Sequence, residues 1–195
     1  MVLTNFIATV ALIGLCSISG NCADAQSSAE LSSRYQAMQE ERSEVDTIED
    51  PTQKLEAYKE LREKYSDIYT SPSFNEAFTE ADIKKICQAV ETETYEADFI
   101  SKSHIAEVIY ARLDDKNFPD TVNKVVVRGQ FAFGRSNISP DTRLAVEYAY
   151  YFPSEVHGAL YFHNGGKRKA KNSWHGQTYI TTDDVGHNFY GSKGW

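Results

Sequence analysis

Three carboxylates lie close together in the sequence and could supply the acid or base of a catalytic site. Glu91, Glu93 and Glu96 end or follow a stretch, residues 80–92, whose apolar spacing is typical of a helix. At roughly 100° per residue, Glu93 returns to within about 20° of Ile86, whereas Glu91 falls about 140° away, on the solvent side. An apolar environment disfavours a charged carboxylate, as general acid catalysis near neutral pH requires. Glu93 is therefore the candidate acid/base residue, and the alternative is a helix-end glutamate that bends out to water.

The second half of the chain supplies aromatic and amide side chains that would suit a sugar. A sugar is bound by apolar ring faces combined with directional hydrogen bonds, so this combination fits a glycan cleft. The same side chains could equally be ordinary core aromatics with an amide that braces a loop. The candidates are Gln130, Phe131, Tyr161, Phe162, Asn164, Trp174, Phe189 and Tyr190.

Histidine and cysteine offer weaker possibilities. The spacing of His157, His163, His175 and His187 matches no compact ligand motif such as H-E-x-x-H, so the sequence predicts no metal site and no cofactor. Cys87 could pair with a histidine as a nucleophile, but it lies on the apolar side of its expected helix, which favours a place in the core.

The charge of the chain is divided unevenly between its halves. The net charge is -8; residues 26–100 hold 8 basic and 18 acidic side chains, whereas residues 101–195 hold 12 basic and 9 acidic ones. An acidic surface repels phosphates, so the first half is not expected to bind nucleic acid. The basic run Lys167-Arg168-Lys169 is either a solvated loop or a surface for an anionic polymer.

The first 25 residues predict an export signal. Phe6 to Leu15 is an apolar run too short to span a bilayer, and Ala23-Asp24-Ala25 has the small residues of a cleavage site. We expect a secreted, extracellular protein, without a stable membrane anchor after cleavage. An uncleaved anchor or a buried helix is the alternative.

The remaining chain predicts an α+β fold that is mostly helical. Residues 26–72 resemble a charged helical hairpin or spacer, which could also bind a protein partner, and residues 73–195 would form the catalytic domain. Thr79 to Asp82 forms a capping box. Within the second part we expect a helix over residues 80–92, helices from near residue 101 and from residue 139 to about 151, and short strands at 159–163 and 179–181.

Six short motifs in order give the stretch from Ile86 to Tyr190 a resemblance to the SleB-like cell wall hydrolases, the group that includes spore cortex-lytic enzymes. The matching pieces are Ala89–Glu93, His104–Leu113, Phe118–Val122, Gly129–Phe131, Gly158–Asn164, and Trp174 with Gly186–Tyr190. They are similar to the catalytic helix end, the "AVAAVILNRV" helix, "FPDTV", "GQF", "GALYFHN" and the closing "W…GxHxFY" of that family.

The resemblance implies a lysozyme-like fold and a lytic transglycosylase that cuts peptidoglycan glycan strands between MurNAc and GlcNAc. Glu93 would be its catalytic acid/base. Gln130, Tyr161 and Asn164 would make polar contacts near the bond to be cut, and His163 and Trp174 would line the cleft.

Departures from the family pattern leave other functions open. The family usually reads "EARGE" where this chain has Glu93–Ala97, so the Arg, the Gly and the second Glu are absent from their places. One alternative is a hydrolytic muramidase with Asp183, Asp184 or Glu147 as a second carboxylate. Others are a non-catalytic wall-binding protein with a degenerate site and a metal-dependent amidase that uses the histidines.

Overall fold

The computed structural model describes residues 22–132, 134–154, 156–165, 173–174 and 176–191. The chain divides into two compact units, and the division falls between Ser71 and Pro72. The expected signal segment before residue 22 and the basic run at 167–171 lie outside the described residues. None of the described helices is long and apolar enough to cross a membrane.

The N-terminal unit contains two helices, α1 (Cys22–Asp46) and α2 (Pro51–Lys64). Asp50 caps α2, because its carboxylate accepts a hydrogen bond from the Gln53 N–H at 2.8 Å and Pro51 occupies the first helical position. The helices run antiparallel, as shown by the ion pair between Lys64 and Glu41 at 2.7 Å. Their contact buries apolar side chains that include Met38, Val45, Leu55, Tyr58 and Leu61.

The C-terminal unit begins with helices whose ends are set by local capping. They are α3 (Phe74–Ala77), α4 (Glu80–Glu93), α5 (Phe99–Asp114), α6 (Val122–Val125) and α7 (Pro140–Tyr151). The expected capping box is confirmed, with the Thr79 hydroxyl accepting from the Asp82 N–H and the Asp82 carboxylate accepting from the Thr79 N–H. Ser139 caps α7 in a similar way, by accepting from the Thr142 N–H.

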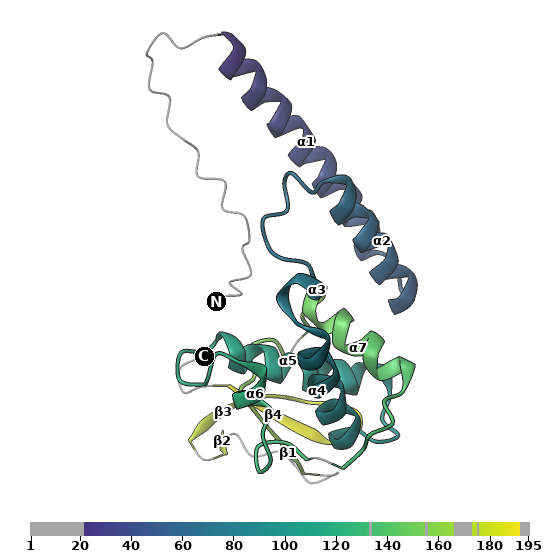
Figure 1. Ribbon diagram of the computed structural model, residues 1–195, viewed down its shortest axis with the longest axis vertical. Coiled ribbons are helices and arrows are strands. Elements are labelled where there is room, and N and C mark those ends of the chain that lie inside the picture. The colour runs from purple at the N-terminus through teal and green to yellow at the C-terminus, as the bar shows by residue number, and fades with distance from the viewer. Residues whose placement is uncertain (1–21, 133, 155, 166–172, 175, 192–195) are drawn as a thin grey trace. The chain divides into compact units, whose positions relative to one another are not determined.

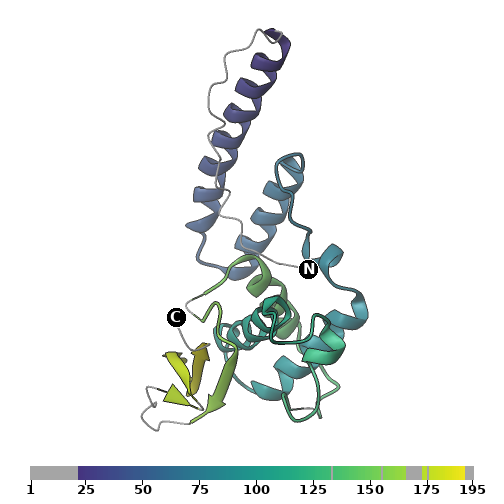
Figure 2. The same cartoon turned by 90° about the vertical axis from the view of Figure 1, so that its left-hand side faces the viewer.

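A four-stranded antiparallel sheet in the order β1-β4-β3-β2 follows the helices and lies to one side of them (Figure 1, Figure 2). Its strands are β1 (Tyr161–Asn164), β2 (Ser173–Trp174), β3 (Gln177–Thr182) and β4 (His187–Gly191). Strands were expected near β1 and β3, but β1 begins two residues later than predicted. The sequence prediction missed β4, which is buried along its whole length and pairs with both β1 and β3.

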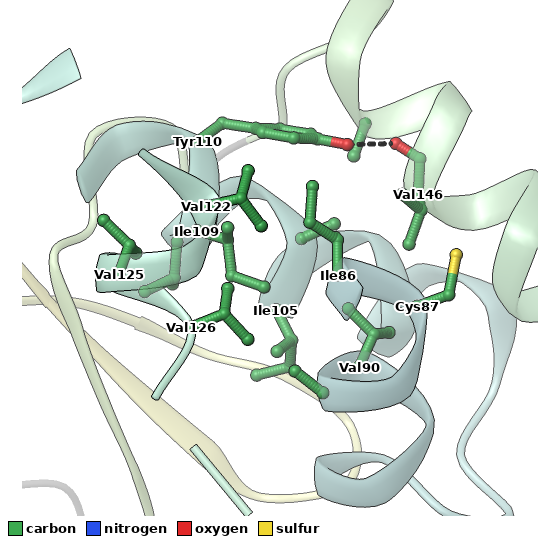
Figure 3. Close-up of a cluster of buried hydrophobic side chains, with 14 of the residues drawn as sticks. Ile86, Cys87, Val90, Ile105, Ile109, Tyr110, Val122, Val125, Val126 and Val146 are labelled. Atoms are coloured by element: carbon green, nitrogen blue, oxygen red, sulfur yellow. Dashed lines mark hydrogen bonds between the residues drawn. The ribbon is translucent and has the colours of Figure 1, made fainter. Parts of the chain in front are cut away.

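The core of this unit gathers around α5. Figure 3 shows Ile105 and Ile109 of α5 facing Ile86 and Val90 of α4, with valines of α6 alongside. Ile105 and Ile109 are fully buried. The phenol of Tyr110 crosses to α7, where it donates a 2.8 Å hydrogen bond to the Val146 carbonyl. The mostly helical α+β expectation is therefore confirmed, and the last turn of α4 lies at the margin of this core.

Candidate active site

Glu93 is the last residue of α4, and its side chain is half-buried. Its Oε1 atom accepts a hydrogen bond from the backbone N–H of Ala132, which follows the Gly129–Phe131 motif. No described residue donates to the other carboxyl oxygen, Oε2. A single carboxyl with one oxygen fixed by the backbone and the other available to a ligand is arranged to give or take a proton.

The placement of Glu91 on the solvent side was wrong. Its side chain is buried, with 7% exposure, and its Oε2 accepts hydrogen bonds from the Ser139 N–H at 3.1 Å, the Ser139 hydroxyl at 3.0 Å and the Thr142 hydroxyl. Burial alone would raise the pKa of Glu91, but these hydrogen bonds outweigh it and hold the pKa below its ordinary value. The angular argument failed because it assumed one buried face, whereas α7 covers a second face at this end of α4.

Arg112, the arginine of the α5 motif, lies at the centre of the site. It is 4% exposed, and its Nε donates to the Leu160 carbonyl at 2.7 Å while Nη1 donates to Gln130 Oε1 at 3.3 Å. Burial lowers the pKa of Arg112 to about 10, and the nearby Tyr161 and Glu93 oppose that shift. Arg112 thus interacts with three of the candidate residues: it donates a hydrogen bond to Gln130, and its charge acts on Glu93 and Tyr161.

Aromatic rings surround the Arg112 guanidinium. Its central carbon lies 4.9 Å from the ring centroid of Phe131, 5.2 Å from that of Phe118 and 5.6 Å from that of Tyr161. Cation–π attraction of this kind holds both the cation and the rings in fixed orientations. The sequence argument quoted Arg112 only as part of a motif; an arginine within an apolar helix was the signal that it forms part of the site.

The structure brings together only some of the predicted binding residues. Gln130 and Tyr161 meet at Arg112, and Gln130 is otherwise exposed. His163 and Asn164 are exposed in β1, where Asn164 points to the face opposite that of Tyr161 because strand residues alternate. Trp174 lies in β2 opposite Gln177, but its side chain lies outside what the structure describes.

The carboxylates proposed for a second catalytic role are not equivalent. Asp183 is occupied by His187, whose N–H donates to Oδ1 at 2.7 Å and whose Nδ1 lies 2.9 Å from Oδ2. Burial opposes ionisation of Asp183, yet the His187 hydrogen bonds prevail and hold its pKa below the ordinary value. Asp184 is exposed in the turn before β4, and Glu147 is half-buried in α7.

Cys87 and the histidines fit other roles. Burial raises the pKa of the Cys87 thiol to about 12, which makes a nucleophilic thiolate unfavourable. Within the described residues, no three side chains among His, Cys, Asp and Glu gather in a way that could hold a metal ion. His187 is buried against Phe162 and Phe189, so its contacts are those of a core residue.

One further carboxyl is buried away from this site. Glu107 of α5 is 3% exposed, and its Oε2 accepts a 3.0 Å hydrogen bond from the Ser154 N–H. Its Oε1 is buried without a hydrogen-bond partner among the described residues. Desolvation is the largest influence and raises the pKa of Glu107 to about 7, although the Ser154 hydrogen bonds oppose it.

Comparisons with known proteins agree with this architecture. Residues 97–190 match the family described as Cell Wall Hydrolase. Two solved structures are similar, each at 23% identity. The catalytic domain of the germination-specific lytic transglycosylase SleB from Bacillus anthracis has a TM-score of 0.50, over 62% of this chain and 99% of that chain. The catalytic domain of the Bacillus cereus SleB protein has a TM-score of 0.49, over 58% of this chain and 91% of that chain.

The region that matches the family lies within the C-terminal unit. The Bacillus anthracis structure shares the fold of this unit, which confirms the expected lysozyme-like fold. Glu93 lies just ahead of the family match, which begins at residue 97. No curated protein is similar enough to this chain to count as a match.

Proposed function

Because residues 97–190 match the family described as Cell Wall Hydrolase, we propose that this chain cleaves the MurNAc–GlcNAc β-1,4 bond of peptidoglycan as a lytic transglycosylase. The observation that carries the proposal is the position of Glu93. It is half-buried at the end of α4, held by the Ala132 N–H and close to the cluster around Arg112. The similar Bacillus anthracis structure is named as a lytic transglycosylase, which supports this choice of reaction.

One carboxyl group is sufficient for the proposed reaction. Protonated Glu93 gives its proton to the glycosidic oxygen as the bond from that oxygen to C1 of MurNAc breaks, and the GlcNAc hydroxyl leaves. The Glu93 carboxylate then takes the proton from the C6 hydroxyl of MurNAc, whose oxygen bonds to C1 to give a 1,6-anhydro sugar. Glu93 ends in its starting state, and no water is consumed.

A hydrolytic muramidase is less well supported. It needs a second carboxylate that acts as a nucleophile or activates water at a set distance from the acid. Asp183 binds His187 with both of its oxygens, so it cannot fill that role without breaking two hydrogen bonds. Asp184 and Glu147 remain as the candidates for this alternative.

The surroundings of Glu93 suggest where the glycan would bind. We propose that Gln130 and Tyr161 contact the sugar beside the bond to be cut, since Arg112 fixes both of them near Glu93. His163 is exposed on the same face of β1 as Tyr161, so it could contact the next sugar. Asn164 points to the opposite face of β1, so it would contact the glycan from another side.

The location of the protein follows from its proposed substrate. A wall-cleaving enzyme must reach peptidoglycan outside the cytoplasmic membrane, so we propose secretion to the cell wall through the segment 1–25.

Product mass tests the proposal. The full chain and its Glu93→Gln variant would be incubated with purified sacculi, and the soluble products analysed by mass spectrometry. We expect anhydro-muropeptides from the unaltered protein and none from Glu93→Gln. Reducing ends, heavier by one water, would instead establish hydrolysis, and Asp184→Asn or Glu147→Gln would then identify the second carboxylate. A folded protein that binds sacculi but releases nothing would establish a non-catalytic wall-binding protein.

A further inference from the structure

The last turn of α4 holds the chain segment that leads into α7. This segment runs from Ala132 to Ser139, and all of it except Phe133 is described. Three consecutive residues of α4 accept hydrogen bonds from its backbone. Glu93 accepts from the Ala132 N–H, Thr92 Oγ1 accepts from the Arg135 N–H at 3.4 Å, and Glu91 accepts from the Ser139 N–H at 3.1 Å.

Glu91 forms the strongest of these attachments. Its Oε2 receives both the N–H and the hydroxyl of Ser139, as well as the Thr142 hydroxyl from the first turn of α7. The carboxylate is buried, and the hydrogen bonds that keep its pKa low favour its charged form. Hydrogen bonds to an ionised acceptor are about twice as strong as neutral ones. By contrast, Thr92 makes one long contact with the same segment.

We propose that Glu91 is a positioning residue for the acid/base Glu93. It fixes the far end of the 132–139 segment, so that the Ala132 N–H at the near end stays bonded to the Glu93 carboxyl. The proposal rests on the proposed function, because it assigns to Glu91 a role in the reaction for which Glu93 is the catalytic residue. Glu91 itself does not contact the substrate, since its side chain is buried between α4 and α7.

A second connection between the same helices provides a matched control. Glu80, at the opposite end of α4, makes an ion pair with Arg143 of α7 at 3.1 Å. Both side chains are largely exposed, and neither forms a hydrogen bond with a described side chain or backbone group of the 132–139 segment. Glu80→Ala therefore removes an α4–α7 contact without disturbing the attachment of Ala132.

The kinetic test compares Glu91→Ala, Glu91→Gln and Glu80→Ala on soluble glycan strands, below the unfolding temperature of each variant. Misplacing a catalytic group by about 1 Å can lower a rate on the order of 100-fold, so we expect Glu91→Ala to lower kcat by about 10- to 100-fold. The KM should stay within about twofold, because no substrate contact is lost. Glutamine keeps an oxygen for Ser139 and should restore most of kcat, and Glu80→Ala should match the unaltered protein.

Amide hydrogen exchange tests the proposal independently of activity. We expect Glu91→Ala to speed exchange at the Ala132 N–H and to leave the amides of α5 unchanged. Glu91→Gln and Glu80→Ala should preserve the protection of Ala132. If Glu91→Ala leaves the Ala132 amide protected, or keeps the kcat of the unaltered protein, the positioning role is wrong.

Failure of the proposed function would give a different result. An unaltered protein that releases no product, or a fully active Glu93→Gln, would overturn the catalytic assignment of Glu93. The exchange measurement would then still decide whether Glu91 holds the Ala132 N–H in place. A loss of kcat in Glu91→Gln as large as that in Glu91→Ala, with Ala132 still protected, would overturn the positioning role alone.

Discussion

Replacing Glu107 by glutamine should abolish a loss of stability that the native protein suffers as the pH rises through the neutral range. Glu107 is buried in α5 with one oxygen bonded to the Ser154 N–H and the other without a described partner. A neutral carboxyl tolerates this environment, whereas a carboxylate loses its hydration there. Glutamine has almost the same shape and keeps an oxygen for Ser154, but it never ionises.

The size of the effect follows from the two pKa values of Glu107. The folded pKa is about 7, raised by burial, against an ordinary value of 4.5. Below pH 4.5 both states hold the proton and Glu107 contributes no pH dependence. Between pH 4.5 and 7 the folded state keeps a proton that the unfolded state has lost, so stability falls as the pH rises, and above 7 it levels off. The total loss is about 3 kcal/mol.

Urea denaturation of the native protein and Glu107→Gln at pH 4.5, 6 and 8 would measure this loss. We expect the stability difference between the two proteins to move in favour of the variant by about 3 kcal/mol between the lowest and highest pH. The other titrating groups are the same in both proteins, so their contributions cancel in the stability difference. Glu91→Gln is the matched control: the pKa of Glu91 lies below its ordinary value of 4.5, so the stability that this carboxylate contributes is lost only on acidification below that pH, and the stability difference for Glu91→Gln should stay nearly constant between pH 6 and 8. A stability difference between the native protein and Glu107→Gln that does not change with pH would refute the reasoning.

Three further predictions concern the core that Figure 3 displays. Ile109→Ala should lower the free energy of unfolding by about 2–5 kcal/mol, measured by urea denaturation, because a fully buried side chain leaves a cavity. Tyr110→Phe should cost about 1 kcal/mol in the same assay, since only the hydrogen bond to the Val146 carbonyl is lost. Cys87 should resist alkylation by iodoacetamide at pH 8 until the protein is unfolded, as mapped by peptide mass, because burial suppresses its thiolate.

The helices were the most predictable part of the fold because their ends are determined locally. Thr79 with Asp82 and Ser139 with Pro140 marked the starts of α4 and α7 correctly, since a cap involves only residues within one turn. The strand β4 was missed for the opposite reason. Its residues, 187–191, are all buried and lack the alternation that marks a half-exposed strand, and its pairing with β1 depends on a distant segment.

The candidate site residues were chosen from helical spacing and from family motifs, and their roles stay a prediction. Glu93 was chosen from the spacing of one helix, and the structure adds its contact with Ala132, which no local pattern could reveal. Glu91 was wrongly predicted to face solvent. Helical spacing gives the angle of a side chain around its helix, but it does not show how many other elements pack against that helix. The role of Arg112 depends on rings from three separate segments, which only the folded chain brings together.

The burial of α5 has a consequence for how this domain can change during evolution. Every residue from Ser101 to Tyr110 is buried, so this part of α5 has no solvent face on which neutral substitutions could accumulate. Its polar residues differ in what they require of the rest of the chain. Lys102 binds the carboxylate of Asp141, so positions 102 and 141 should change together among related proteins. Glu107 accepts a hydrogen bond from the backbone N–H of Ser154, which any residue except proline could supply. Arg112, by contrast, contacts the Gln130 side chain and three aromatic rings, so those positions should change together with it.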